Sequence, residues 1–147
     1  MKIGIDSSVI VAGVHANHPR HGAAAQWLVQ ALTAHELMVC HHSVLESYAV
    51  LTSLPGELRV TPSEARDLLE ATVRANMVVA EFQPESIWSI LESLVPLSTA
   101  GGRSYDAFTA CVLHASGARA ISTLNPKHFA GLIEGLQVID PGEIGGA

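Results

Sequence analysis

Short apolar runs alternate with helical patterns along almost the whole chain. The runs typical of buried strands cover residues 2–6, 36–40, 77–82, 118–122 and 136–139. Patterns typical of helices stand between them, at residues 21–34, 43–53, 62–76, 84–97 and 104–116. A strand followed by a helix and a further strand forms a βα unit, and such units place their strands in parallel. The sequence therefore predicts an α/β fold with a mostly parallel sheet of roughly five strands and helices on both faces.

Length and composition limit the domain organisation and the compartment. A chain of 147 residues has the usual size of one domain, and 48% hydrophobic residues can supply a sizeable core. We expect one domain over residues 1–147, with a frayed tail at residues 141–147. Cys40 and Cys111 have no CxxC spacing, which predicts reduced thiols and a cytoplasmic location. No apolar run approaches the roughly 18 residues of a membrane span, so no membrane partner is expected.

Three acids stand where an ionised side chain is costly. Asp6 ends the first apolar run, whereas Glu46 and Asp106 lie within otherwise apolar helical patterns. Because the carboxyl ends of parallel strands meet at one edge of a sheet, we expect the three carboxylates to share a crevice there. Converging carboxylates repel one another unless they bind a cation, and oxygen ligands suit Mg²⁺ or Mn²⁺. The sequence therefore predicts a binding site for such an ion.

Each acid also has a purely structural interpretation. Residues 43–46 have the Ser-x-x-Glu pattern of a capping box, in which Glu46 would bond back to the start of its helix. Ser104 could cap a helix whose dipole stabilises Asp106, and Asp6 could cap the short helix expected after it. Only the convergence of all three acids favours the metal site over these separate roles.

Four short motifs follow one another along the chain and span nearly all of it. They are IDSSV at residues 5–9, SVLES at residues 43–47, GGRSYDA at residues 101–107 and STLNPKHF at residues 122–129. Each motif is weak alone, but their order and spacing make the set specific. By this set the chain resembles the PIN-domain ribonucleases and, among them, the VapC-type toxins of bacterial toxin-antitoxin pairs.

The resemblance implies a fold and a function. It implies a single PIN-like domain that acts as a Mg²⁺- or Mn²⁺-dependent endoribonuclease, hydrolysing RNA phosphodiesters through a metal-activated water. Asp6, Glu46 and Asp106 then carry over as the catalytic and metal-binding residues. It also implies a homodimer that is the toxin of a type II pair and is neutralised by a cognate antitoxin. The net charge of -6 does not exclude RNA, because metal-binding acids contribute to it.

The chain departs from the family pattern at one position. Family members often carry a fourth acid near the strand that follows Asp106, but residues 123–131 contain no carboxylate and offer Asn125 and His128 instead. The missing acid motivates an alternative function, a PIN-like binding module with weak catalysis. Four further residues are expected to contact the acids, their ion or the substrate: Ser7, Arg103, Thr123 and Asn125.

Histidines and aromatic residues give weaker signals. His15, His18 and His21 have a regular spacing, but Pro19 interrupts any helix through them, so we interpret them as solvated or capping side chains rather than zinc ligands. Most aromatic residues fit the apolar faces of helices. Tyr105, next to Asp106, is the aromatic residue best placed to face a substrate, although a hydroxyl satisfied within the fold is the default.

Overall fold

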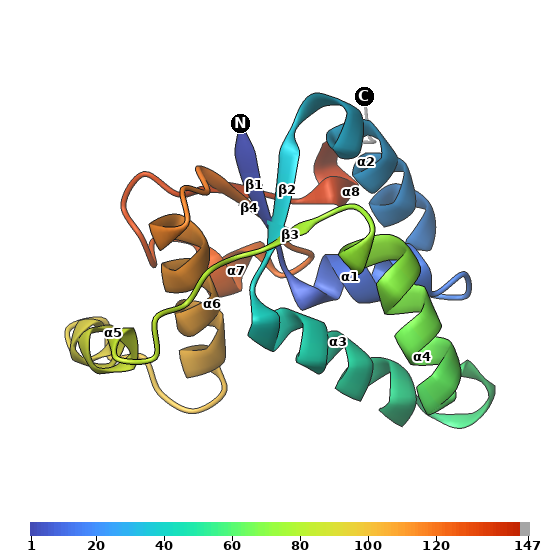
Figure 1. The fold of residues 1–147 in the computed structure, drawn as a ribbon, viewed down its shortest axis with the longest axis horizontal. Helices are drawn as coiled ribbons and strands as arrows, with labels where there is room; N and C mark the ends of the chain where they lie inside the picture. The colour runs from blue at the N-terminus through green and yellow to red at the C-terminus, as the bar shows by residue number, and fades with distance from the viewer. Residues whose placement is uncertain (145–147) are drawn as a thin grey trace.

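Five parallel strands form the centre of the molecule (Figure 1). The structure is a computed structural model that describes residues 1–144; residues 145–147, part of the tail expected to be frayed, lie outside the described residues. The strands are β1 (Lys2–Ile5), β2 (Glu36–Val39), β3 (Val78–Val79), β4 (Ala120–Ser122) and β5 (Gln137–Ile139). Their order in the sheet is β3-β2-β1-β4-β5, and every neighbouring pair is parallel. The predicted α/β fold is confirmed.

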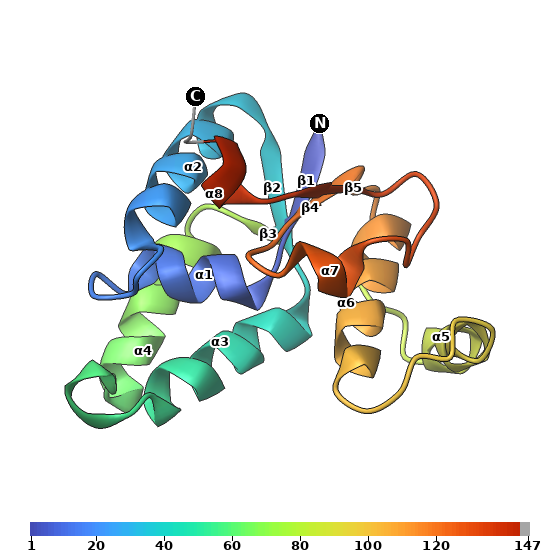
Figure 2. The same cartoon turned by 180° about the vertical axis from the view of Figure 1, so that it is seen from behind.

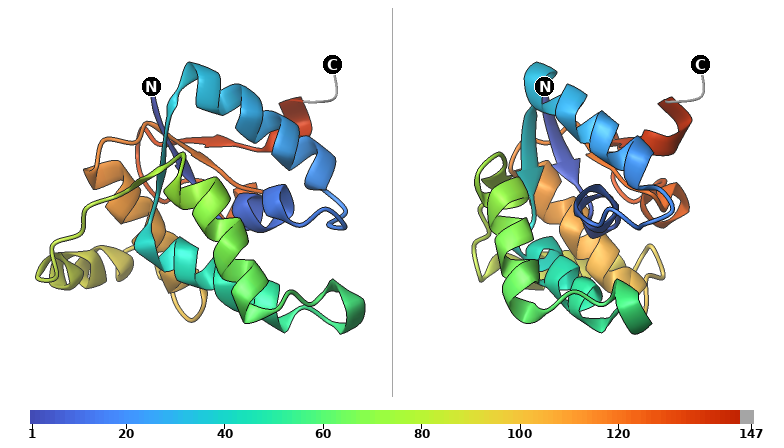
Figure 3. Two further views of the ribbon diagram at one scale, coloured as in Figure 1. Left: turned by 45° about the vertical axis from the view of Figure 1, so that its right-hand side comes forward. Right: turned by 90° about the vertical axis from the view of Figure 1, so that its right-hand side faces the viewer.

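Helices cover both faces of this sheet, as the alternating pattern predicts. They are α1 (Ser7–Val14), α2 (His21–Ala34), α3 (His41–Ser53), α4 (Pro62–Leu69), α5 (Ser86–Leu94), α6 (Arg103–Ala115), α7 (Pro126–Phe129) and α8 (Pro141–Ile144). Helices α1 to α4 and α8 lie on one side of the sheet, and α5 to α7 lie on the other (Figures 2 and 3). Within residues 1–144, no helix is both long and apolar enough to span a membrane.

The two faces of the sheet bury two separate hydrophobic cores. Side chains of a strand alternate between the faces, so Ile3 and Ile5 of β1 pack into the core with α1 to α4. Gly4 between them faces Leu113 of α6, whose side chain would collide with a Cβ at this position. The absence of a side chain at Gly4 therefore lets α6 approach the sheet closely, which fixes the helix that carries Asp106.

Two predicted helices differ in length from those observed. The helix predicted at residues 62–76 is α4 only as far as Leu69, and then continues as a π-helical turn over Glu70–Arg74. The helix predicted at residues 84–97 is shorter at both ends and forms α5. None of the residues affected by these differences lines the cavity that contains the predicted acids.

The chain end departs from the frayed tail that the sequence predicts. Residues Pro141–Ile144 form the short helix α8, and Pro141 is fully buried. The preceding Asp140 stabilises this turn, because its Oδ1 accepts hydrogen bonds from Arg20 Nη2 at 2.7 Å and from the Gly142 backbone N–H at 2.8 Å. The expectation of fraying is wrong for Pro141–Ile144, since it ignored a contact with a residue far away in the sequence.

Candidate functional site

The three predicted acids come from three elements and line one cavity. Asp6 lies between β1 and α1, Glu46 lies in α3, and Asp106 lies in the first turn of α6. Figure 2 shows α1, α3 and α6 around this edge of the sheet. The cavity has a volume of about 770 Å³, and its further polar lining includes Ser7, Ser8, His18, Arg20, Arg103, Asn125 and His128. The fold thus brings together residues that lie up to a hundred positions apart in the sequence.

Asp6 is held by two hydroxyl groups and does not cap α1. Its side chain is only 7% exposed, and its Oδ2 accepts hydrogen bonds from Ser8 Oγ at 2.6 Å and Thr123 Oγ1 at 2.8 Å. Each hydroxyl in turn accepts a backbone N–H, that of Leu124 for Ser8 and that of Asn125 for Thr123. No side chain of the described residues forms an ion pair with Asp6, so its charge is compensated by neutral donors alone. A buried carboxylate of this kind still attracts a cation.

Asp106 is disfavoured as an anion by its surroundings. Burial raises the pKa of its carboxyl above the ordinary value, and repulsion from Asp6 and Glu46 raises it further. His128 and Arg103 oppose this shift of the pKa, and His128 Nδ1 lies 3.3 Å from Asp106 Oδ2. The three carboxylates therefore interact with one another through their charges, and a divalent cation between them would relieve the repulsion.

Glu46 does not form the capping box that its sequence pattern allows. Helix α3 starts at His41, so Ser43 lies inside the helix, where its carbonyl accepts a hydrogen bond from Ser47 Oγ at 2.7 Å. Glu46 instead pairs with His42, whose Nε2 lies 3.2 Å from Glu46 Oε2. The capping interpretation of Glu46 is wrong, because the cap of the helix is Cys40, three residues before Ser43.

The similar pattern at Thr61 and Glu64 shows what a real capping box looks like in this chain. The Glu64 backbone N–H donates to Thr61 Oγ1 at 3.3 Å, and the Thr61 N–H donates to Glu64 Oε2 at 3.0 Å. Asp106 takes part in no capping box either, because the residue at the cap of α6 is Gly102 rather than Ser104. Glu46 and Asp106 therefore do not have the capping role that Glu64 has, and each contacts a histidine instead.

The donor atoms fit a hard divalent cation, although the side chains do not surround one. Carboxylate oxygens are the ligands that Mg²⁺ and Mn²⁺ prefer. Among the described residues, however, no group of three or more His, Cys, Asp or Glu side chains is arranged to hold a metal ion. Glu46 is turned toward His42 and Asp106 toward His128. Binding an ion would therefore require these two carboxylates to leave their histidine partners.

The other predicted residues lie at or beside the cavity. Ser7, Arg103 and Asn125 line the cavity. Thr123 does not line it, but its hydroxyl donates a hydrogen bond to Asp6. Ser8, which contacts Asp6 directly, and His128, which contacts Asp106, are not among the residues that the sequence predicts for the site. Proximity within the motifs IDSSV and STLNPKHF could have indicated both residues.

Arg20, which the sequence offers with Lys127 and Arg119 as a cation able to contact phosphate, is a further residue of the cavity. Its guanidinium is anchored by Asp140 at 2.7 Å and also donates to the Leu124 carbonyl at 3.5 Å. Together with Arg103 it places two cations in a cavity that three acids also line. No pattern in the sequence connects Arg20 with the acids, because the link runs through Asp140 and the segment after β4.

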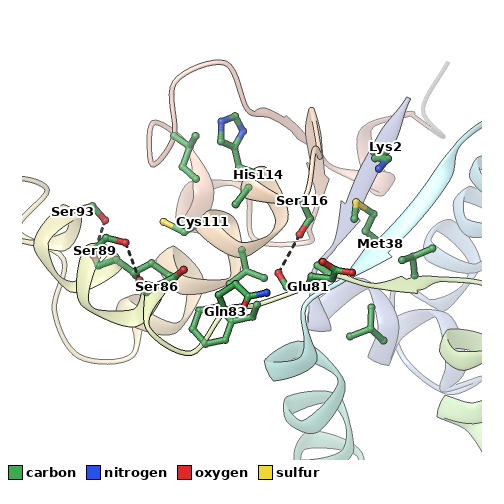
Figure 4. A pocket seen from close by; sticks show the side chains of 18 of the residues that line it. Lys2, Met38, Glu81, Gln83, Ser86, Ser89, Ser93, Cys111, His114 and Ser116 are labelled. Atoms are coloured by element: carbon green, nitrogen blue, oxygen red, sulfur yellow. Dashed lines mark hydrogen bonds between the residues drawn. The ribbon is translucent and has the colours of Figure 1, made fainter.

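A second cavity of about 770 Å³ lies between α5, the end of α6 and the edge of the sheet (Figure 4). Three of its serine hydroxyls bond to backbone carbonyls, whereas the buried Nδ1 of His114 has no hydrogen-bond partner among the described residues. Ser89 Oγ and Ser93 Oγ donate to carbonyls of their own helix, and Ser116 Oγ donates to the Glu81 carbonyl at 3.4 Å. None of the three predicted acids lines this second cavity.

Comparison with known proteins places the chain in one family. A model of the PIN domain matches residues 3–131 of the chain. The crystal structure of VapC20 from Mycobacterium tuberculosis, a Sarcin-Ricin loop cleaving toxin, is similar with a TM-score of 0.69 and 20% identity. The similarity covers 90% of this chain and 97% of that one. The chain belongs to the PIN domain family.

Within this family, ribonucleases of the VapC type are similar to the chain in sequence. Ribonuclease VapC27 of Mycobacterium tuberculosis is 30% identical over 108 residues, which are 74% of this chain and 74% of the relative. Ribonuclease VapC40 of the same species is 31% identical over 120 residues, which are 82% of this chain and 84% of the relative. The resemblance to VapC-type members that the four motifs indicate is confirmed.

Proposed function

We propose that the chain is a Mg²⁺- or Mn²⁺-dependent endoribonuclease and the toxin of a type II toxin-antitoxin pair. The observation that carries this proposal is the meeting of Asp6, Glu46 and Asp106 in one cavity with Arg20 and Arg103. Acids alone would repel an RNA backbone, whereas acids that share a cation beside two arginines can receive a phosphodiester. Membership in a family whose similar members are VapC ribonucleases supports the same activity.

The residues of the cavity have different roles in the proposed hydrolysis. Asp6 and Asp106 would hold the ion, with Asp6 kept in position by Ser8 and Thr123. When bound, Mg²⁺ or Mn²⁺ supplies water activation and neutralises charge that develops on the phosphate. Arg103 and Arg20 orient the phosphate from the sides of the cavity, because a guanidinium can donate two hydrogen bonds to its oxygens.

Glu46 differs from the two aspartates in its exposure and its partner. Its side chain is 40% exposed, against 21% for that of Asp106, and His42 engages Oε2. We assign Glu46 to the attacking water. Glu46 orients this water, and its Oε1 takes one proton from the water as the water oxygen bonds to phosphorus. The second proton stays on the new phosphate, and the ribose 3′ oxygen leaves and is protonated by solvent, so the products carry a 5′-phosphate and a 3′-hydroxyl.

The proposed activity can be tested with purified protein and purified total RNA. Wild type should cleave RNA at discrete sites in Mg²⁺ or Mn²⁺ and lose this activity in EDTA, whereas Asp6→Asn should be inactive in either condition. Because the substitution keeps the shape of the side chain and removes only its charge, circular dichroism should show an unchanged fold. A metal-independent activity that survives in Asp6→Asn would overturn the proposal.

A specific observation supports the alternative of a binding module with weak catalysis. Asn125 and His128 occupy the segment where family members often carry a fourth acid, and a neutral amide compensates less of a cation's charge than a carboxylate does. Under this alternative, wild type and Asp6→Asn would bind RNA equally and neither would cleave it. The cleavage experiment therefore separates the two functions.

The antitoxin and the homodimer are part of the proposal. A toxin of this class requires an inhibitor, and a cavity lined by three carboxylates suits a peptide that presents an arginine or lysine. A light-scattering mass of the purified chain tests the dimer. Inhibition of RNA cleavage by the product of a neighbouring gene tests the antitoxin.

A further inference from the structure

Two aromatic rings from different helices are stacked next to residues that line the acid cavity. The rings of His42 in α3 and Tyr105 in α6 have centroids 4.9 Å apart and an angle of only 4° between their planes. Tyr105 is nevertheless 58% exposed. A ring that is covered on one face and remains more than half exposed offers its other face to solvent.

The covered face of Tyr105 rests on a supported side chain. His42 is held by Glu46 Oε2 at 3.2 Å, and its ring also meets the ring of Phe108 edge-on at a centroid distance of 6.3 Å. Phe108 in turn packs edge-on against Phe82 at 5.1 Å. His42 therefore links the exposed ring of Tyr105 to the interior of the fold and fixes its orientation.

The position of Tyr105 in α6 connects this stack with the proposed chemistry. Arg103 and Asp106, which lie two residues before and one residue after it, both line the acid cavity. The first turn of α6 thus contains a cation, an aromatic ring and a carboxylate close together in the chain. A nucleotide has a complementary set of groups, namely a phosphate, a base and the phosphodiester that is to be cleaved.

We propose that Tyr105, backed by His42, stacks a nucleobase of single-stranded RNA next to the scissile phosphate. This inference rests on the proposed ribonuclease function and adds a binding site to it. Proteins that bind single strands combine cations along the backbone with aromatic rings on which bases stack, and every base has a suitable face. The site therefore favours an unpaired nucleotide without selecting one base.

Packing between helices alone does not explain the arrangement. A ring that serves only to join α3 and α6 gains most when it is buried, as apolar area removed from water supplies the stabilisation. Phe108 is closer to this description, since it is partly buried against the core and contacts His41, His42 and Phe82. Tyr105 instead leaves more than half of its surface in water, in the same helical turn as Arg103 and Asp106.

Replacement of Tyr105 tests the proposal on a short single-stranded RNA that spans a cleavage site mapped in total RNA. Tyr105→Leu removes the ring and keeps an apolar side chain, whereas Tyr105→Phe keeps the ring. Loss of one stacked base should raise KM about 5- to 150-fold with little change in kcat. Tyr105→Phe should behave as wild type. Trp88→Leu is the matched control, because Trp88 is an aromatic residue of 64% exposure on α5, a helix that contributes no residue to the lining of the acid cavity.

A second measurement identifies the base itself. Abasic nucleotides are placed one at a time along the same RNA, and KM is measured with wild type and Tyr105→Leu. If stacking occurs, one position next to the cleaved bond should raise KM for wild type and have no further effect on Tyr105→Leu. An unchanged KM in Tyr105→Leu, a loss confined to kcat, or additive effects at every position would overturn the stacking site while leaving the ribonuclease function intact. Absence of RNA cleavage by wild type would overturn both.

Discussion

The two cavities at the ends of α6 have the same volume of about 770 Å³ but very different chemistry. In the cavity beside α5, the hydroxyls of Ser89 and Ser93 bond to carbonyls one turn away in the same helix. In the acid cavity, the side chains that meet come from α1, α3, α6 and the segment after β4. Hydrogen bonds within one helix need no ligand, whereas like charges gathered from distant elements do.

The volume of a cavity therefore does not identify the functional site of this fold. What distinguishes the acid cavity is the unfavourable electrostatic energy of its carboxylates, which the side chains of the protein do not fully compensate. Asp6 is buried with only neutral donors, and the pKa of Asp106 is raised by burial and by the other acids. Substitutions in the acid cavity should therefore change activity and stability much more than substitutions in the cavity beside α5.

The largest contrast is expected for Asp106→Asn. Loss of this carboxylate should reduce RNA cleavage on the order of a thousandfold, at the upper end of the cost of losing one charge-stabilising group. The metal-free variant should also be more stable than wild type at neutral pH, since it no longer carries an anion that burial and repulsion disfavour. Thermal unfolding in EDTA and RNA cleavage in Mg²⁺ measure the two effects on the same samples.

The raised pKa of Asp106 also predicts a pH dependence of metal-free stability. A carboxyl whose folded pKa exceeds its ordinary value contributes stability at pH values below that ordinary value of 3.8 and loses it as pH rises through the raised pKa. Wild type in EDTA should thus lose stability over this range relative to Asp106→Asn. Parallel stability curves for the two proteins would contradict the assigned cause.

A smaller effect is expected from the support of Asp6. Thr123→Val keeps the shape of the side chain and removes the donor to Asp6 Oδ2, leaving a buried acceptor with Ser8 alone. We expect a loss of about 1–3 kcal/mol in the free energy of unfolding and a fall of about 10- to 100-fold in activity. Urea unfolding and RNA cleavage provide the measurements. Wild-type activity in Thr123→Val would show that the orientation of Asp6 is not critical.

Asn125→Asp restores a carboxylate in the segment where the family often has one. Because Asn125 lines the acid cavity, the added charge should strengthen Mn²⁺ binding by roughly tenfold. Without metal the same charge should lower stability through repulsion from the other acids. Calorimetric titration with Mn²⁺ checks the affinity, and Asn125→Ala shows whether any gain comes from the charge rather than from loss of the amide.

The smallest effect is expected in the cavity beside α5. Glu81→Gln changes an acid that lines this cavity but lies outside the acid cavity, and the Glu81 carbonyl that accepts from Ser116 is unaffected. The change in unfolding free energy should stay within about 0.5 kcal/mol, and RNA cleavage should be unchanged. A clear loss of cleavage in Glu81→Gln would remove the distinction between the two cavities.

The parts of the structure that the sequence predicts depend on local patterns. Helix α2 has the predicted bounds, and every predicted strand is found, because hydrophobic periodicity and apolar runs are properties of neighbouring residues. The placement of Asp6 at a strand end also followed from such a run. Because the predicted strands are parallel, their carboxyl ends share one edge of the sheet, which is where the acids were expected to meet.

The parts that the sequence misses depend on partners that are distant in the chain. Thr123 was expected to contact the acids, but the sequence does not show that its hydroxyl and that of Ser8 donate to the same oxygen of Asp6. Arg20 stabilises α8 through Asp140, 120 positions away, and no pattern among neighbouring residues reveals this pairing. The start of α3 at His41 was also missed, since Ser43 and Glu46 imitate a cap inside the helix. Sequence therefore locates the acids, whereas the contacts that orient them require the structure.

Calorimetric titration of the metal-free protein with Mn²⁺ tests most directly whether the gathered acids form one ion site. Wild type and Glu81→Gln should bind Mn²⁺ with equal affinity, whereas Asp6→Asn and Asp106→Asn should each lose nearly all of it. Equal Mn²⁺ affinity in all four proteins would contradict the account.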